Sequence, residues 1–270
     1  MRGLRKYTSV FRIRFINSMQ YRIAALAGVA TQFAWAGMII LAFSAFYRTD
    51  PNAFPMTFSQ TTTYIWLQQA LMLLIFMAMS DTEIISAIRD GSIAYEMVRP
   101  IDIYNRWICQ IIAQRLAGVS LRALPMFIVS ALLPYPYGIS LPVNGLHFLL
   151  FIVSLVTAAL LVAAILNLAY VALFYTNSHM GIQTIIWGSA TFLSGMTIPI
   201  PFFPEPIRSI AQVLPFAALQ DLPLRIYSGH IYGVELVQRM GLQIFWLLFM
   251  LGLGRLLIKR ALRRVFVQGG

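Results

Sequence analysis

Residues 146–174 read LHFLLFIVSLVTAALLVAAILNLAYVALF, and this stretch decides the fold class of the 270-residue chain. It contains no Asp, Glu, Lys or Arg and exceeds the about 20 apolar residues that a helix needs to cross a bilayer. Backbone polar groups in lipid must be satisfied internally, which a helix achieves within one segment. We therefore predict an all-α integral membrane protein with six transmembrane helices, at residues 23–46, 63–79, 111–133, 146–174, 182–200 and 240–258.

The composition of the whole chain supports a membrane protein. Hydrophobic residues make up 59% of the chain and charged residues 11%, whereas soluble domains are about half apolar and a quarter charged. The net charge is +11, but the basic residues lie at the ends of apolar blocks and form no single patch. This distribution argues against a nucleic-acid partner and indicates that the lipid bilayer surrounds most of the chain.

The basic residues also predict the orientation in the plasma membrane. With both termini in the cytoplasm, most of the 20 Lys and Arg residues fall in inner segments, as the positive-inside rule requires. The predicted domains are a cytoplasmic interface helix (1–22), a six-span domain (23–258) and a basic cytoplasmic tail (259–270). Arg115 and Arg122 fall within the third span, where they either snorkel to the inner surface or line a pathway.

Two inner segments carry amphipathic patterns. In residues 1–22, apolar side chains recur at helical spacing, which predicts a helix on the inner leaflet or a simple basic anchor. In the inner loop 81–106, a short helix with an apolar side should end near Gly91. Such a loop suits docking to a cytoplasmic ATPase, although a solvated connector is the alternative. The residues of this candidate coupling site are Glu83, Ile84, Ile88, Arg89, Asp90, Gly91, Tyr95, Glu96 and Arg99.

Small residues and prolines mark two further features. Small side chains let helices approach closely, so we predict a dimer interface, with packing inside one subunit as the alternative. Its residues are Ala27, Ala30, Ala34, Gly37, Gly181, Gly188 and Gly195. The proline-rich outer segment 199–238 should form short re-entrant helices at 206–214 and 216–222. Asn167, deep in the fourth span, should hydrogen-bond to a neighbouring helix.

The sequence lacks the motifs by which a transporter would use an ion gradient or hydrolyse ATP itself. All nine acidic residues are expected outside the apolar cores, which argues against an ion-coupled transporter or channel. A P-loop needs glycine before its lysine, but Lys6 and Lys259 follow Arg5 and Ile258. No residue spacing suggests a catalytic triad or a metal site, which makes a membrane-embedded enzyme a weaker alternative. We expect no enzyme activity, cofactor or metal in this chain, and ATP hydrolysis in a separate polypeptide.

Three phrases resemble the permeases of the ABC-2 transporter family. They are GSIAYEMVRPIDIYNRW (91–107), LSGMTIPIPFFPEPIRSIAQVLPF (193–216) and RRVFVQGG (263–270), and the branch they resemble is bacterial, encoded as paired permeases beside an ATPase. The resemblance implies two permease subunits, paralogous or identical, and two ATPase subunits that hold ATP and Mg. It also implies that the loop around Glu83–Arg99 couples to the ATPase and that spans one and five face the partner permease. Drugs, peptides, lipids and glycans are the exported substrates that it implies.

Overall fold

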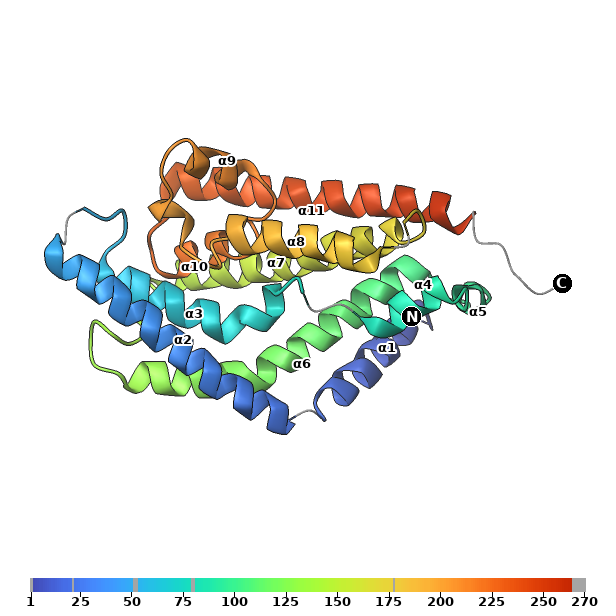
Figure 1. Ribbon diagram of the computed structural model, residues 1–270, viewed down its shortest axis with the longest axis horizontal. Helices are drawn as coiled ribbons and strands as arrows, with labels where there is room; N and C mark the ends of the chain where they lie inside the picture. Colours follow the sequence, from blue (N-terminus) through green and yellow to red (C-terminus); the bar gives the residue numbers. More distant parts are fainter. Residues whose placement is uncertain (1, 21, 51–52, 79–80, 177, 264–270) are drawn as a thin grey trace.

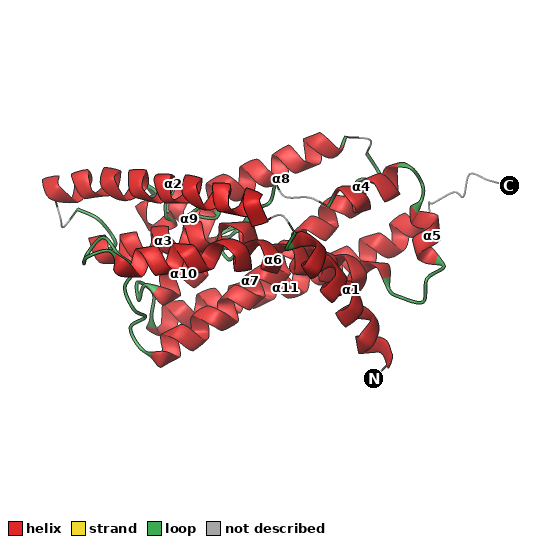
Figure 2. Cartoon of the chain, turned by 90° about the horizontal axis from the view of Figure 1, so that it is seen from below, coloured by secondary structure: helices red, strands yellow, loops and turns green. Residues whose placement is uncertain are grey.

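The computed structural model describes residues 2–20, 22–50, 53–78, 81–176 and 178–263, and every regular element within these ranges is a helix (Figure 2). The longer helices are α1 (Arg2–Ser18), α2 (Arg22–Thr49), α3 (Phe58–Ile75), α6 (Ile103–Leu132), α7 (Gly145–Ala172), α8 (His179–Leu193) and α11 (Gly233–Leu262). The short ones are α4 (Thr82–Arg89), α5 (Ile93–Met97), η1 (Ile200–Phe202), α9 (Ile207–Val213) and α10 (Asp221–Tyr227).

Helix α7, formed by the most apolar stretch of the sequence, is the centre of the bundle. It packs against α11, α10, α6, α3 and α8, and all residues from 161 to 167 are buried. Asn167 lies within this buried run, and its Nδ2 donates to the Tyr104 carbonyl of α6 at 3.4 Å. The predicted interhelical bond of Asn167 is therefore confirmed.

Among the residues that the structure describes, four helices are long and apolar enough to cross a membrane. They are Ala27–Thr49 of α2, Ile103–Leu132 (α6), Gly145–Ala172 (α7) and Gly233–Leu262 (α11). The second and fifth predicted spans correspond to α3, with 18 residues, and α8, with 15. Helix α3 carries Thr and Gln side chains that are buried among α2, α6, α7 and α10, so it is less apolar than a lipid-facing helix.

The bundle has two distinct ends (Figure 1). One end holds α4, α5 and the C-terminal end of α11, with α1 packed alongside α6 nearby. The opposite end holds the connections between α2 and α3 and between α6 and α7, together with α10. We refer to these as the α5 end and the α10 end.

The proline-rich segment folds back into the bundle. Helix α9 covers most of predicted helix 206–214, but 216–222 is wrong, because the second helix begins only at Asp221. Helix α10 packs against α7 and α3, which carries Asp221 into the interior with 2% exposure. The expectation that every acidic residue lies outside the core is therefore wrong for Asp221, and also for Asp81, which is 5% exposed. Its carboxylate accepts hydrogen bonds from Tyr64 Oη at 3.2 Å and from the Ile200 N–H at 3.1 Å, and Arg225 Nη1 lies 3.4 Å away.

Gly195 lies at the contact between α3 and the segment before α10. Helix α8 ends at Leu193, and Gly195 follows with φ +81°, a conformation that costs other residues about 1–3 kcal/mol. Its carbonyl accepts a hydrogen bond from Tyr64 Oη at 3.2 Å, and a Cβ added to Gly195 would lie 2.4 Å from Tyr64 Oη. Gly195 therefore does not share a helix face with Gly181 and Gly188, and its predicted place in a dimer interface is wrong.

We predict that Gly195→Ala lowers the free energy of unfolding by about 1–3 kcal/mol, because it adds backbone strain and a contact with Tyr64. Thermal unfolding of the purified protein in detergent measures this effect. Gly188→Ala is the matched control, since a Cβ at this helical position meets nothing within 4 Å. Equal midpoints for the two variants would contradict the tight fit at Gly195.

Candidate coupling site at the α5 end

Helix α4 begins at a buried aspartate that fixes its direction. The Asp81 carboxylate caps the helix by accepting from the N–H groups of Glu83 at 3.0 Å and Ile84 at 3.4 Å. Its own backbone N–H donates to the hydroxyl of Tyr170 in α7 at 2.8 Å. A helix cap of this kind contributes about 1 kcal/mol. Asp81 thus joins the start of α4 to the central helix of the bundle.

Arg14 joins the N-terminal helix α1 to the same point. Its Nη2 pairs with the Asp81 carboxylate, and its Nη1 lies 2.7 Å from Glu83 Oε1. Burial by itself would lower the pKa of Arg14, but the hydrogen bonds and charges of Glu83 and Asp81 raise it overall. The Asp81 side chain is 4% exposed and that of Glu83 is 71% exposed, so the Asp81 pair is the one shielded from solvent.

Arg115 holds the end of α3, immediately before the connection to α4. The last carbonyls of a helix lack intrahelical donors, and Arg115 Nη1 donates to two of them, Leu73 and Leu74, each at 3.1 Å. The side chain of Arg115 is 1% exposed, so the expectation that it snorkels to the membrane surface is wrong. It acts as a buried cap that ties α6 to α3.

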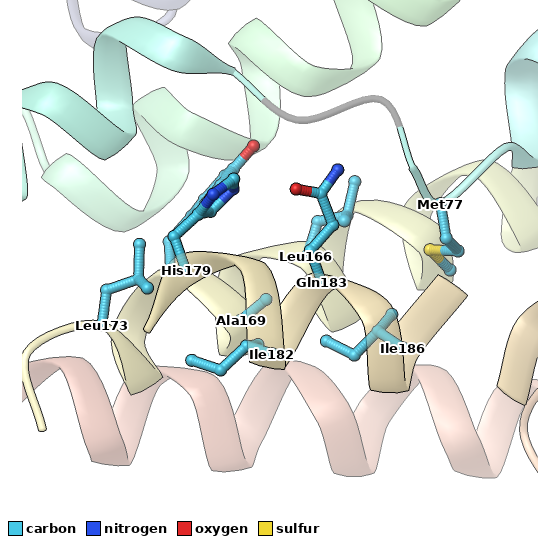
Figure 3. Close-up of a pocket in the computed structure, with 9 residues that line it drawn as sticks. Met77, Leu166, Ala169, Leu173, His179, Ile182, Gln183 and Ile186 are labelled. Carbon is cyan, nitrogen blue, oxygen red and sulfur yellow. The ribbon is translucent and has the colours of Figure 1, made fainter. Parts of the chain in front are cut away.

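The connection between α3 and α4 also contacts α8. Gln183 Nε2 donates to the Ala78 carbonyl, and Figure 3 shows Gln183 and His179 pointing from α8 toward this connection. A small pocket beside them is lined mainly by apolar side chains of α7 and α8, together with Met77. Arg14, Arg115, Tyr170 and Gln183 therefore bring four helices, α1, α6, α7 and α8, to the base of α4.

The apolar side of α4 faces the chain's own core. Ile84 and Ile85 are 4% and 7% exposed, and Ile88 packs against the same cluster. The expectation that Ile84 is free to contact an ATPase is therefore wrong, because α4 packs its apolar side against the bundle, and Ile88 is half-buried there. Two of the acidic side chains of the site have partners within the chain, since Glu83 pairs with Arg14 at 2.7 Å and Glu96 with Arg106 at 2.8 Å.

The exposed residues of the site lie farther along, from the end of α4 through α5 to Arg99. We define the exposed tip as Arg89, Asp90, Gly91, Tyr95, Met97, Val98 and Arg99. Tyr95 is 76% exposed and Val98 is 83% exposed. Gly91 has φ +73°, which lets α4 end and the chain turn into α5. Lys6 of α1 donates to the Pro100 carbonyl at 2.8 Å, which joins α1 to the residue directly after the tip.

The remaining candidate interface residues have free surfaces. Ala27, Ala30 and Ala34 of α2 are exposed, and so is Gly181 of α8. Gly37 and Gly188 are half-buried, with no atom near an added Cβ. In the single chain these six residues are therefore exposed or half-buried.

A known protein family matches most of this chain. The family described as ABC-2 family transporter protein matches residues 33–269. The chain belongs to this family. The ABC-2 family comprises membrane transport components of ABC transporters, so the chain is a multi-pass membrane protein and an ABC-2 permease. A search of curated proteins found no match to it.

The sequence of this ABC-2 permease contained signals for the residues that were missed. Arg14 occurs three residues after Phe11 and one before Phe15, which places a basic group within the apolar stripe of α1. Met97 and Val98 are apolar residues in a charged inner loop, outside any span. Helix α1 packs against α6, and within α1 the rings of Phe11 and Phe15 stack with their centres 5.8 Å apart.

Proposed function

We propose that this ABC-2 permease is the membrane subunit of an ATP-driven exporter in the bacterial plasma membrane. It has six spans, with α3 and α8 as the second and fifth, short outer re-entrant helices, and both termini in the cytoplasm. Its substrate is apolar or amphipathic, in the class of drugs, peptides, lipids or glycans. The apolar outer surfaces of α2, α8 and α11 support this class, with Leu41, Ile185 and Leu248 each more than 60% exposed.

The exposed tip is the observation that carries the proposal. ATP is hydrolysed outside the membrane, so its free energy must reach the spans through a physical contact. The tip combines exposed apolar and charged side chains at the same end as the basic C-terminal turns of α11. Helix α4 leads from the tip to Asp81, which contacts Arg14 and Tyr170. Just before it in the chain, Arg115 contacts the end of α3 and Gln183 contacts the Ala78 carbonyl. A push on the tip would therefore act on α1, α3, α6, α7 and α8 together.

The buried acid at the α10 end favours ATP over an ion gradient as the energy source. A proton- or sodium-coupled carrier usually holds a carboxylate that binds the coupling ion. Asp221 is buried, but it already has Arg225, Tyr64 and a backbone N–H as partners. A carboxylate held in this way is structural, and it joins α10 to α3.

The assembly we propose contains two permeases and two ATPase subunits. The permeases meet through α2 and α8, which lie along the same edge of the molecule in Figure 2. The second permease is a paralogue or an identical copy. The exposed small residues of α2 and the open space at Gly188 support close helix approach on this edge.

We predict that Gly188→Leu raises the dissociation constant of the permease pair by about tenfold or more, because the added side chain separates the helices. Native mass spectrometry of the purified complex measures the dimer fraction. Gly252→Leu is the matched control, since Gly252 is an exposed glycine of α11 with the same open space. A dimer fraction that falls equally in both variants, or in neither, contradicts the α2–α8 interface.

The orientation has a direct test in a Cys109→Ser background. Tyr135 is 82% exposed at the α10 end, and Val98 is 83% exposed at the α5 end. A membrane-impermeant thiol reagent added to intact cells should label Tyr135→Cys and should label Val98→Cys only after lysis. The reverse pattern would place the α5 end outside and contradict the proposal.

The experiment that tests the function is purification of the tagged chain from its native membranes in mild detergent. An ATPase should co-purify, and candidate substrates should increase its ATP hydrolysis. The competing result is substrate movement by the chain alone in liposomes with only an ion gradient, which would establish a secondary transporter.

A further inference from the structure

A second cavity lies at the α5 end, between the α5–α6 connection and the last turns of α11. Its volume is about 400 Å³, within the range of ligand sites. Arg255 and Lys259 of α11 line one side, with Asp102 and Tyr104 opposite. Met97 of the exposed tip also lines this cavity, whereas Arg14, Asp81 and Tyr170 do not.

The cavity presents two cationic side chains, and neighbouring residues hold one of them, Arg255, in place. Arg255 Nη2 donates to Asn105 Oδ1 at 2.8 Å, and its guanidinium carbon lies 5.9 Å from the centre of the Tyr104 ring. These contacts fix the guanidinium and leave other N–H groups available. Lys259 is exposed one turn farther along α11. The single carboxylate of the lining, Asp102, is engaged as the cap of α6, accepting from the Asn105 N–H at 2.8 Å.

The rest of the lining is apolar. Met97, Ile101 and Ile258 line the same cavity beside the cations. The cavity also lies where the apolar part of α11 gives way to Arg255, Lys259 and Arg260, the position at which a helix reaches the headgroup layer. An anionic group attached to an apolar body matches this combination better than a freely soluble anion.

We propose that this cavity binds the phosphate headgroup of an anionic lipid from the membrane leaflet at the α5 end. Arg255 and Lys259 contact the phosphate, and the apolar lining contacts the glycerol and first acyl carbons. Basic pockets between helices near a membrane surface bind such headgroups. Because Met97 belongs both to this cavity and to the exposed tip, the lipid stabilises the tip against α11.

A binding titration of the delipidated protein in neutral detergent tests this site. The probe is phosphatidylglycerol labelled on an acyl chain, with equally labelled phosphatidylcholine as the neutral lipid. Phosphatidylglycerol should bind about fivefold more tightly or better. Lys259→Gln should weaken its binding about fivefold, and Arg255 keeps its contacts with α6 in this variant. Arg260→Gln removes the same charge from an exposed neighbour that does not line the cavity, so it should change the affinity less than about twofold.

Three results would overturn the proposal. Equal losses in Lys259→Gln and Arg260→Gln would show attraction by the basic helix end without a site. Equal affinity for the two lipids would show that the headgroup charge is not recognised. Displacement of the labelled lipid by millimolar glycerol 3-phosphate would show a site for a soluble phosphate compound.

Discussion

Replacing Val98 with aspartate should weaken binding of the partner ATPase by about tenfold or more, equivalent to at least about 1.4 kcal/mol. Val98 is 83% exposed beside Tyr95 in the exposed tip, and it contributes apolar surface that burial against a partner would remove from water. An aspartate at this position places a charge in that contact, where desolvation opposes binding. Co-purification of the ATPase with each tagged variant measures the effect.

The control for Val98→Asp is Val234→Asp. Val234 is 73% exposed in the first turn of α11, at the α10 end of the molecule. Both variants add the same charge at an exposed valine, so their effects on insertion and folding should be alike. If both retain the ATPase equally, the ATPase contacts this permease through another surface, and α1 is then the next candidate.

Reversing the charge of Arg14 should produce the second large effect. Arg14→Glu removes the partner of the buried Asp81 carboxylate and places a like charge beside it, and breaking a buried pair costs about 3–5 kcal/mol. Helix α1 should then separate from α4. The ATPase should still bind, because the exposed tip is unchanged. Substrate-stimulated ATP hydrolysis and transport should fall by about tenfold or more.

Arg12→Glu is the matched control for Arg14→Glu, because Arg12 is exposed on the same helix and undergoes the same change of charge. It should support normal transport. Arg14→Lys keeps one charge but loses the two-pronged contact, and it should have an intermediate effect. If Arg14→Glu transports as well as Arg12→Glu does, α1 is only an anchor and the Asp81 pair has no part in coupling.

The sequence predicted the long helices well because their apolar length alone determines them. Residues 146–174 were expected to form a helix, and α7 runs from Gly145 to Ala172. The ends of α3 and α8 were less predictable, since side chains from other helices determine where they stop. Arg115 caps α3 from α6, and Gly195 ends the α8 region at a contact with Tyr64 of α3. No local pattern specifies such partners.

The short helix before Gly91 was predicted correctly, since α4 runs from Thr82 to Arg89, but the sequence did not show which side of this helix is exposed. The pattern of Ile84, Ile85 and Ile88 indicates an apolar face on a short helix, but it does not say what covers that face. In the structure the bundle core covers it. The exposed apolar residues, Tyr95, Met97 and Val98, occur in a stretch too short for a periodic pattern.

The exposed tip as the contact with the ATPase is the central claim, and site-specific photo-crosslinking tests it most directly. Val98→Cys in the Cys109→Ser background is labelled with a benzophenone maleimide in membranes and illuminated. The account predicts a covalent adduct that contains the ATPase, and no such adduct from Tyr135→Cys at the α10 end, which is equally exposed. An ATPase that co-purifies with the permease but forms no adduct from Val98→Cys would contradict it.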